Sequence, residues 1–254
     1  MSIEVKGLIC GYGKKTILNN VNFMVSPEDS LCLLGANGIG KTTIFKTLLG
    51  FIPPLAGEIT VDGKDLNKMS HKERAIKMAY VPQAKSYSYK YTVSDMIMMG
   101  RSLHIPKFMS PSKKDHEAIE AVMEQMDLLA YRNAYYSELS GGEQQIILIA
   151  RAIAQGSDYI IMDEPASNLD YSNQKKLLDT IKNLTKNNKG IMMASHTPEH
   201  AFVCCNKALL ISRSRKYQFG SVNEIVTSEN LSAAYGVEIE VVQLNSGKKT
   251  CCLI

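Results

Sequence analysis

The sequence predicts an α/β fold with a core of mainly parallel strands, and three features of the chain lead to this expectation. A glycine-rich segment at 35–43 follows the apolar stretch 31–34 and opens into a helical pattern, which is typical of a strand, a turn and a helix. Two further apolar runs, 159–162 and 191–194, each precede a polar loop, as buried parallel strands do. With 254 residues, of which 45% are hydrophobic, the chain can bury one sizeable core.

The amino-terminal stretch alternates apolar and polar side chains, which predicts antiparallel strands ahead of the glycine-rich segment. A turn at 11–13 separates two such strands and has Tyr12 at its tip. Later in the chain, Asp62 and Gly63 predict the turn of a hairpin that carries residues 58–61. An antiparallel β subdomain is therefore expected beside the parallel core.

The glycine-rich segment is a complete phosphate-binding loop. Glycines let successive backbone N–H groups point inward, and the helix that follows adds the positive end of its dipole. Lys41 is expected to reach the β- and γ-phosphates of a nucleoside triphosphate, and Thr42 to ligate Mg²⁺. The alternative is a glycine-rich turn with an incidental lysine, which the strand-to-helix context disfavours. The predicted binding residues here are Gly35, Ala36, Asn37, Gly38, Gly40, Lys41, Thr42 and Thr43.

Helical patterns replace the strands between about 92 and 155, so an inserted α-helical subdomain is expected at about 84–155. Ser110, followed by Pro111, predicts the start of one of its helices. Apolar residues then recur at helical spacing: Ile119, Val122, Met123, Met126 and Leu129.

Two adjacent carboxylates, Asp163 and Glu164, follow the apolar run at 159–162. Catalytic groups of open parallel sheets collect at the carboxyl ends of their strands. Asp163 is expected to hold Mg²⁺ directly or through an intervening ligand, and Glu164 to orient and partly deprotonate an attacking water. An acidic turn after a strand is common by itself, but its pairing with a phosphate-binding loop favours the catalytic interpretation.

The segment 139–143, Leu-Ser-Gly-Gly-Glu, allows two interpretations. Ser140 and Glu143 form a capping sequence for a helix at 144–155. The same helix start, with Gly141 and Gly142, also exposes backbone N–H groups that suit the γ-phosphate of a nucleotide.

The carboxyl-terminal part carries three weaker signals. Residues 221–224 are typical of a capping box that opens a short helix, and 237–241 alternate like an edge strand. The polar stretch 245–250 is expected to be frayed.

Together, the phosphate-binding loop, the 139–143 motif and the Asp163–Glu164 pair resemble the ATP-binding subunits of ABC transporters, over almost the whole chain. The resemblance implies a P-loop NTPase (RecA-like) core that binds ATP and Mg²⁺, with 1–243 as the ATP-binding domain and 244–254 as a polar tail. It also implies a head-to-tail dimer of two such chains around two ATP molecules. The residues that would contact the ATP held by the other chain are Ser140, Gly141, Gly142 and Glu143.

Further positions match the family one by one. Tyr12 corresponds to the aromatic residue that stacks on adenine, and Gln83 to the glutamine that touches Mg²⁺ and the attacking water. Asp170 matches the loop that links the two nucleotide sites, and His196 the histidine that contacts the γ-phosphate. Asn168 departs from the family, in which alanine is usual here. The resemblance thus implies the catalytic residues Glu164, His196 and Gln83 and the Mg²⁺ ligands Thr42, Gln83 and Asp163.

Composition limits the kinds of partner. The net charge of +4 comes from 29 basic and 25 acidic residues without a long basic run, so no nucleic acid is expected. No stretch approaches the roughly 18 apolar residues of a membrane span, and the amino terminus lacks the layout of a secretory signal. The six cysteines include no C-x-x-C pair and are expected to be buried free thiols. A cytosolic chain with a separate membrane partner is therefore expected.

The segment from 86 to 101 is the expected contact with that partner. Its tyrosines and methionines suit an adaptable groove for a partner's helix, and ordinary core packing of the methionines is an equal alternative on the residues alone. Resemblance favours the contact, because 92–101, 196–201 and 231–242 look like the ATP subunits of importers for iron–siderophore, haem or cobalamin.

Those importers combine a second copy of the ATP subunit, multispan permease subunits and, indirectly, a substrate-binding protein. The resemblance implies a peripheral location on the cytoplasmic face of the cell membrane and import of a metal chelate powered by ATP hydrolysis. Two rivals are a soluble ABC-type ATPase that acts on a ribosome, DNA or iron–sulfur assembly complex, and the ATP subunit of an exporter.

Overall fold

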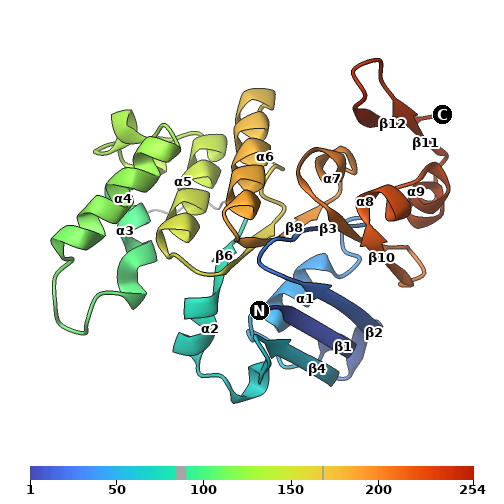
Figure 1. Cartoon of the computed structure of the whole chain (residues 1–254), viewed down its shortest axis with the longest axis horizontal. Helices are drawn as coiled ribbons and strands as arrows, with labels where there is room; N and C mark the ends of the chain where they lie inside the picture. The colour runs from blue at the N-terminus through green and yellow to red at the C-terminus, as the bar shows by residue number, and fades with distance from the viewer. Residues whose placement is uncertain (84–89, 168) are drawn as a thin grey trace.

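The computed structural model describes residues 1–83, 90–167 and 169–254, and Figure 1 shows the arrangement of their elements. The strands are β1 (Ile3–Tyr12), β2 (Lys15–Val25), β3 (Ser30–Leu34), β4 (Ala56–Val61), β5 (Lys64–Asp65), β6 (Met78–Val81), β7 (Tyr159–Asp163), β8 (Gly190–Ser195), β9 (Lys207–Ile211), β10 (Tyr217–Ser221), β11 (Ile239–Gln243) and β12 (Lys249–Leu253). The α-helices are α1 (Lys41–Leu48), α2 (His71–Lys77), α3 (Val93–Met98), α4 (Lys113–Gln125), α5 (Gly141–Ala154), α6 (Tyr171–Lys186), α7 (Glu199–Cys204), α8 (Val222–Ile225) and α9 (Ser228–Tyr235). Short 3₁₀ helices are η1 (Leu66–Lys68), η2 (Met99–Leu103), η3 (Leu129–Tyr131) and η4 (Tyr136–Glu138).

A six-stranded sheet forms the centre of the molecule, in the order β10-β9-β3-β8-β7-β6. The pairs from β9 to β6 are parallel, and only the edge strand β10 runs antiparallel to its neighbour. The carboxyl ends of β3, β7 and β8 therefore meet at one edge of the sheet. The predicted α/β fold with buried parallel strands at 159–162 and 191–194 is confirmed.

Both faces of this sheet are covered, because successive side chains of a strand point to opposite faces. On β3, Cys32 and Leu34 belong to a core shared with helices α3 to α9. Leu31 and Leu33 belong to a second core shared with α1 and strands β1, β2 and β4. The full burial of β3 follows from this double cover and holds its carboxyl end in place.

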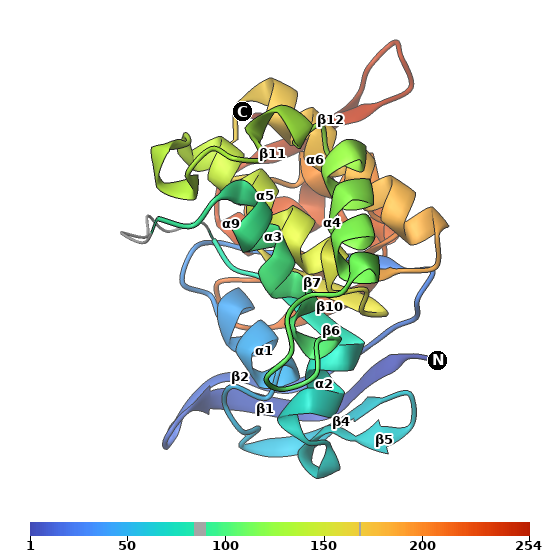
Figure 2. The ribbon, with the colours of Figure 1, turned by 90° about the vertical axis from the view of Figure 1, so that its left-hand side faces the viewer.

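The second layer is an antiparallel sheet in the order β2-β1-β4-β5, and Figure 2 shows β1, β2 and β4 alongside α1. Its two hairpins close at the pairs Tyr12–Lys15 and Val61–Lys64. The predicted amino-terminal strands and the hairpin at 58–63 are confirmed.

Helices α3, α4 and α5 pack against one another on one side of the molecule (Figure 1). One expectation for α4 is wrong: Ser112, rather than Ser110, is its N-cap, and Pro111 lies before the helix. Ser112 is preferred because Asp115 completes a reciprocal capping box with it, whereas no carboxylate follows Ser110 at that spacing. Leu129, expected on the buried face of this helix, begins η3 and is 43% exposed.

The carboxyl-terminal end differs from the expected frayed tail. The short helix α8 opens with the predicted capping box, but β11 begins at Ile239 and pairs antiparallel with β12. Strand β12 is also held by tertiary contact, since the Cys251 backbone N–H donates to Glu199 Oε1 at 3.1 Å. The cysteines are free, and Cys252 is exposed rather than buried. The boundary at 243 and the limits of the helical subdomain stay predictions.

No helix in the part of the chain given by the structure is both long and apolar enough for a membrane crossing.

Candidate active site

The phosphate-binding loop connects the end of β3 to the start of α1 and depends on glycine at defined positions. Gly35, Gly38 and Gly40 have positive φ angles of 151°, 75° and 123°. A Cβ atom on Gly40 would lie 2.7 Å from Ile17 Cγ2, and one on Gly35 would lie 2.7 Å from the Ile211 carbonyl oxygen. The loop therefore follows a path that side chains at these positions would obstruct.

Helix α1 begins without a side-chain cap on its first amides, and its first turn contains no acidic residue. An uncapped helix start of this kind suits an anion. Lys41 is 4% exposed and donates from Nζ to the carbonyl oxygens of Gly35 at 2.8 Å and Ala36 at 3.2 Å. The loop thus surrounds the ammonium group that the sequence assigns to the phosphates.

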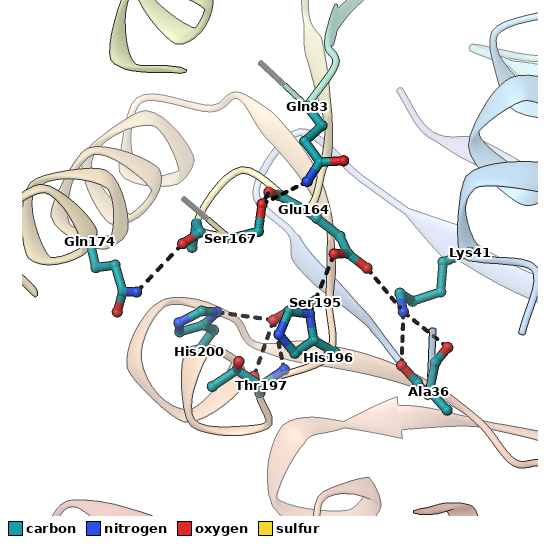
Figure 3. Close-up of polar contacts among 12 residues, drawn as sticks. Ala36, Lys41, Gln83, Glu164, Ser167, Gln174, Ser195, His196, Thr197 and His200 are labelled. Atoms are coloured by element: carbon teal, nitrogen blue, oxygen red, sulfur yellow. Dashed lines mark hydrogen bonds and ion pairs between the residues drawn. The ribbon is translucent and has the colours of Figure 1, made fainter. Parts of the chain in front are cut away.

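Glu164 links Lys41 to His196 (Figure 3). Its Oε1 lies 3.2 Å from Lys41 Nζ, and its Oε2 lies 3.4 Å from His196 Nδ1. The backbone of Glu164 has a φ of 50°, in the left-handed region that few residues other than glycine adopt. The turn after β7 therefore holds the carboxylate at the loop, within reach of a residue that follows β8.

Asp163 ends β7 and is buried, and its Oδ1 has no hydrogen-bond partner among the residues of the structure described above. Burial raises the pKa of this carboxyl, while the Thr42 hydroxyl and the Lys41 charge lower it. A desolvated, unpartnered carboxylate oxygen beside a hydroxyl fits a small divalent cation that prefers oxygen ligands. Thr42 and Asp163 therefore fit the predicted Mg²⁺ site.

Gln83 follows β6 and reaches this edge through a residue that the sequence did not single out. Its Nε2 donates to Ser167 Oγ at 3.1 Å, and Ser167 Oγ donates to the Glu164 carbonyl oxygen at 3.0 Å. Within the described ranges, no hydrogen bond joins Gln83 to Thr42 or Asp163. Its role as a Mg²⁺ ligand stays a prediction.

Two other supporting residues were missed. Tyr80, on β6, has its pKa raised to about 12 by burial, by the Asp163 charge and by a hydrogen bond to Asp163. Tyr235, on α9, donates its hydroxyl to the His196 carbonyl oxygen at 3.2 Å. Neither carries a local sequence signal, because both act through partners that are distant in the chain.

The remaining predicted site residues make contacts other than with the loop. Ser140 caps α5 through a box with Glu143, and Ser140 and Gly141 are exposed while Gly142 is buried. Asp170 caps α6, since the Asn173 backbone N–H donates to its Oδ1 at 2.7 Å. Tyr12 is 48% exposed at the end of β1. Among the residues described, no hydrogen bond or ion pair joins any of these to 35–43, so their nucleotide contacts stay predictions. Asn168 and residues 84–89 lie outside the described residues.

Comparison with known proteins agrees with this geometry. Residues 18–167 match the ABC transporter family. An uncharacterized ABC transporter ATP-binding protein of Haemophilus influenzae is 39% identical over 242 residues, which cover 95% of this chain and 92% of the relative. A "Probable iron chelatin transport ATP-binding protein" of Helicobacter pylori is 32% identical, with 95% and 96% covered.

Among solved structures, one titled "An inward-facing conformation of a putative metal-chelate type ABC transporter" matches with a TM-score of 0.87 and 30% identity. The match covers 100% of this chain and 97% of that chain. The family match spans more than half of the chain, and the relatives match it almost end to end. The chain belongs to the ABC transporter ATP-binding family, whose members hydrolyse ATP.

Proposed function

We propose that the chain is the ATP-hydrolysing subunit of an importer that moves a metal chelate, of the iron–siderophore, haem or cobalamin type, through a separate membrane permease. The observation that carries the proposal is the convergence of Lys41, Asp163, Glu164 and His196 at one sheet edge. The cargo class is supported by the names of the Helicobacter pylori relative and of the metal-chelate type transporter.

Before hydrolysis, Lys41 exchanges the Glu164 carboxylate for the phosphates of ATP. Its three donors are directed at Gly35 O, Ala36 O and Glu164 Oε1, so arrival of a triphosphate transfers the ammonium group from the carboxylate to the phosphates. Glu164 then accepts a proton from the water that attacks the γ-phosphorus, and the bond between this phosphorus and the ADP oxygen breaks. His196 orients Glu164 through the 3.4 Å contact.

Magnesium, held by Thr42 and Asp163, would supply positive charge to the phosphate oxygens. Burial prepares Asp163 for this role, because its unpartnered Oδ1 has lost its hydration and a bound cation would compensate that loss. Gln83 keeps the turn of Glu164 in place through Ser167.

The complete nucleotide site requires a second copy of the chain. Ser140 and Gly141 are exposed at the start of α5, with room around Gly141, so an anion brought by another molecule can reach the helix start. In a head-to-tail dimer, each 140–143 segment would cover the ATP of the other copy. Closing and opening of this dimer would deliver the work of hydrolysis to the permease.

A groove of about 430 Å³ is the candidate docking site for the permease. Phe51 and Met99 line it and are 62% and 39% exposed. Met99 and Gly100 belong to the predicted contact segment 86–101, of which 86–89 lie outside the described residues. Tyr80 connects this groove to the site, because its ring packs edge-on against Phe51 and its hydroxyl interacts with Asp163. The chain would thus lie peripherally on the cytoplasmic face, with a substrate-binding protein as an indirect partner and no nucleic acid.

The test is uptake in the organism that encodes the chain. Deletion of the gene should abolish accumulation of one radiolabelled cargo among an iron–siderophore, haem and cobalamin, and the wild-type gene should restore it. Glu164→Gln should retain ATP binding but lower hydrolysis by about a hundredfold or more, and should fail to restore uptake. Unchanged uptake of all three cargoes, or tight association of the chain with ribosomes, would contradict the proposal.

A further inference from the structure

Two glutamines on neighbouring helices make the same pair of contacts. Gln144, on α5, donates from Nε2 to the carbonyl oxygens of Tyr136 and Leu139, both at 3.0 Å. Gln174, on α6, donates from Nε2 to the carbonyl oxygens of Leu169 at 3.0 Å and Ala166 at 3.4 Å. Each glutamine lies four residues after the N-cap of its helix, and its two acceptors lie one and four residues before that N-cap.

This contact fixes the chain that enters each helix. The carbonyls ahead of a helix have no partner within it, and a side-chain amide carries two N–H donors that can serve two carbonyls at once. The caps themselves satisfy other groups: Ser140 and Glu143 bond each other, and Asp170 accepts from the Asn173 backbone. The glutamines are therefore a second, separate restraint on the same two helix starts.

Both helix starts border the proposed nucleotide sites. The carbonyls held by Gln144 lie one and four residues before Ser140, which with Gly141 would meet the ATP of the other copy. Ala166, held by Gln174, follows Glu164 by two residues, and Figure 3 shows Gln174 on the far side of Ser167 from Gln83. Gln174 thus restrains the turn that aims Glu164 within its own chain.

We propose that Gln144 and Gln174 are positioning residues for ATP hydrolysis, which hold the 140–143 segment and the Glu164 turn at the distances that the reaction needs. The Gln144 half rests on the proposed dimer, whereas the Gln174 half concerns residues of one chain. Neither glutamine touches the nucleotide; each acts through main-chain carbonyls.

The chain offers a matched control in Asn230 on α9. Its Nδ2 donates to the carbonyl oxygens of Ile225 at 3.1 Å and Glu224 at 3.4 Å, just ahead of its own helix. This amide makes the same kind of contact as Gln174 and has similar partial burial, and among the described residues it has no hydrogen bond to the active site. Removing this contact therefore shows how much such a contact contributes to the stability of the fold, without an effect on the active site.

The test compares Gln144→Glu, Gln174→Glu and Asn230→Asp with the wild-type chain. Each substitution keeps the shape of the side chain but turns both carbonyl contacts repulsive while the carboxylate is ionised. At about pH 8, kcat for ATP should fall about tenfold in each glutamine variant, with the ATP dissociation constant unchanged. At about pH 6, the ratio of variant to wild-type kcat should rise, since burial raises the pKa of the new carboxyl and its protonated form can donate one bond.

Gln144→Leu and Gln174→Leu, which cannot donate at any pH, should stay low at both values, and Asn230→Asp should keep wild-type kcat throughout. A ratio that does not change with pH, or an equal loss in Asn230→Asp, would overturn the proposal. Thermal unfolding of every variant identifies losses caused by misfolding.

A second measurement separates this inference from the proposed function. The Glu164→Gln chain should dimerise with Mg²⁺ and ATP, and Gln144→Glu added to it should weaken dimerisation about tenfold at pH 8. If the Glu164→Gln chain stays monomeric, the proposed dimer and the Gln144 half are both wrong, and kcat still judges Gln174. If it dimerises and Gln144→Glu has no effect, only the inference about Gln144 is wrong.

Discussion

His200 is a buried base near the catalytic edge, in the segment 196–201, to which the sequence assigned no separate role. Its Nδ1 lies 3.0 Å from Ser195 Oγ, which also accepts the Thr197 backbone N–H at 3.0 Å. Burial lowers the pKa of His200, the nearby His196 lowers it further, and Glu199 opposes both effects. A neutral imidazole therefore fixes the loop that carries His196.

Stability should fall in acid because of this residue. The folded pKa of His200 lies below its ordinary value, so below about pH 6.5 the unfolded chain binds a proton that the native chain does not. Above that pH, neither state binds this proton and His200 costs no stability. As the pH falls below it, protonation of the unfolded chain lowers the free energy of unfolding. His200→Asn keeps a polar partner for Ser195 but does not titrate, so its free energy of unfolding should fall less steeply between about pH 7 and pH 5.

Urea unfolding of the wild-type chain and of His200→Asn at several pH values checks this prediction. The effects of groups that titrate in both proteins cancel when the two curves of unfolding free energy against pH are subtracted. Parallel curves would mean that His200 does not titrate differently in the folded state.

The sequence predicts the central site residues well because their positions follow from local spacing. Lys41 lies at a fixed place in the loop, and Asp163 and Glu164 follow directly from the end of a buried strand. Tyr80 and Ser167 could not be predicted in this way. Tyr80 interacts with Asp163 on another strand, and Ser167 accepts from Gln83, 84 residues away in the chain, so only the folded sheet brings these pairs together.

At the level of elements, helix α4 shows how a capping box defines a boundary. Ser112 donates from Oγ to Asp115 Oδ2 at 2.6 Å, while the Asp115 backbone N–H donates to Ser112 Oγ at 3.4 Å. Asp115 also contacts Arg101 Nε at 3.1 Å, and the bonds from Ser112 lower its pKa to about 2. The same cap therefore anchors η2 to α4.

Ser112→Ala should lower the free energy of unfolding by about 1 kcal/mol, because the helix loses its N-cap. Ser110→Ala is the matched control and should change it by less than about half that amount, because Ser110 lies outside the helix and is exposed. Urea unfolding of both variants provides the comparison. Equal losses, or a larger loss for Ser110→Ala, would place the functional helix start at the residue that the proline pattern favoured.

At the level of the whole molecule, the sequence predicts the layers better than the ends. Strands β3, β7 and β8 are short apolar runs because both of their faces are covered, and that pattern is visible without a structure. Strand β12 is partly exposed and polar at its start, and its order comes from pairing with β11 and from Glu199. Its sequence alone therefore resembles a loose tail.

In the proposed dimer, each nucleotide site combines the 35–43 loop of one copy with the 140–143 segment of the other, and this arrangement can be tested by mixing two variants. Lys41→Ala removes the phosphate-binding ammonium group of a chain. Gly141→Asp puts a carboxylate where the other copy's γ-phosphate is expected, without disturbing its own chain: a Cβ there meets nothing within 4 Å, and an acidic residue suits the first turn of a helix. Each variant alone should have almost no ATPase activity, because every site of its homodimer lacks one essential part.

An equal mixture of the two variants should regain activity. In a mixed dimer, the intact Lys41 of one chain meets the intact Gly141 of the other, so one complete site forms beside one that lacks both parts. Random pairing makes about a quarter of all sites complete, which sets the upper limit of recovery relative to the wild type. ATPase measurements on the mixture and on each variant alone test this. A double variant that carries both substitutions in one chain is the control. Mixed in equal amount with the wild type, it should leave complete sites only in wild-type homodimers, which again make up about a quarter of all sites. Absence of recovery in the first mixture would mean that Lys41 and Gly141 serve the same chain's nucleotide.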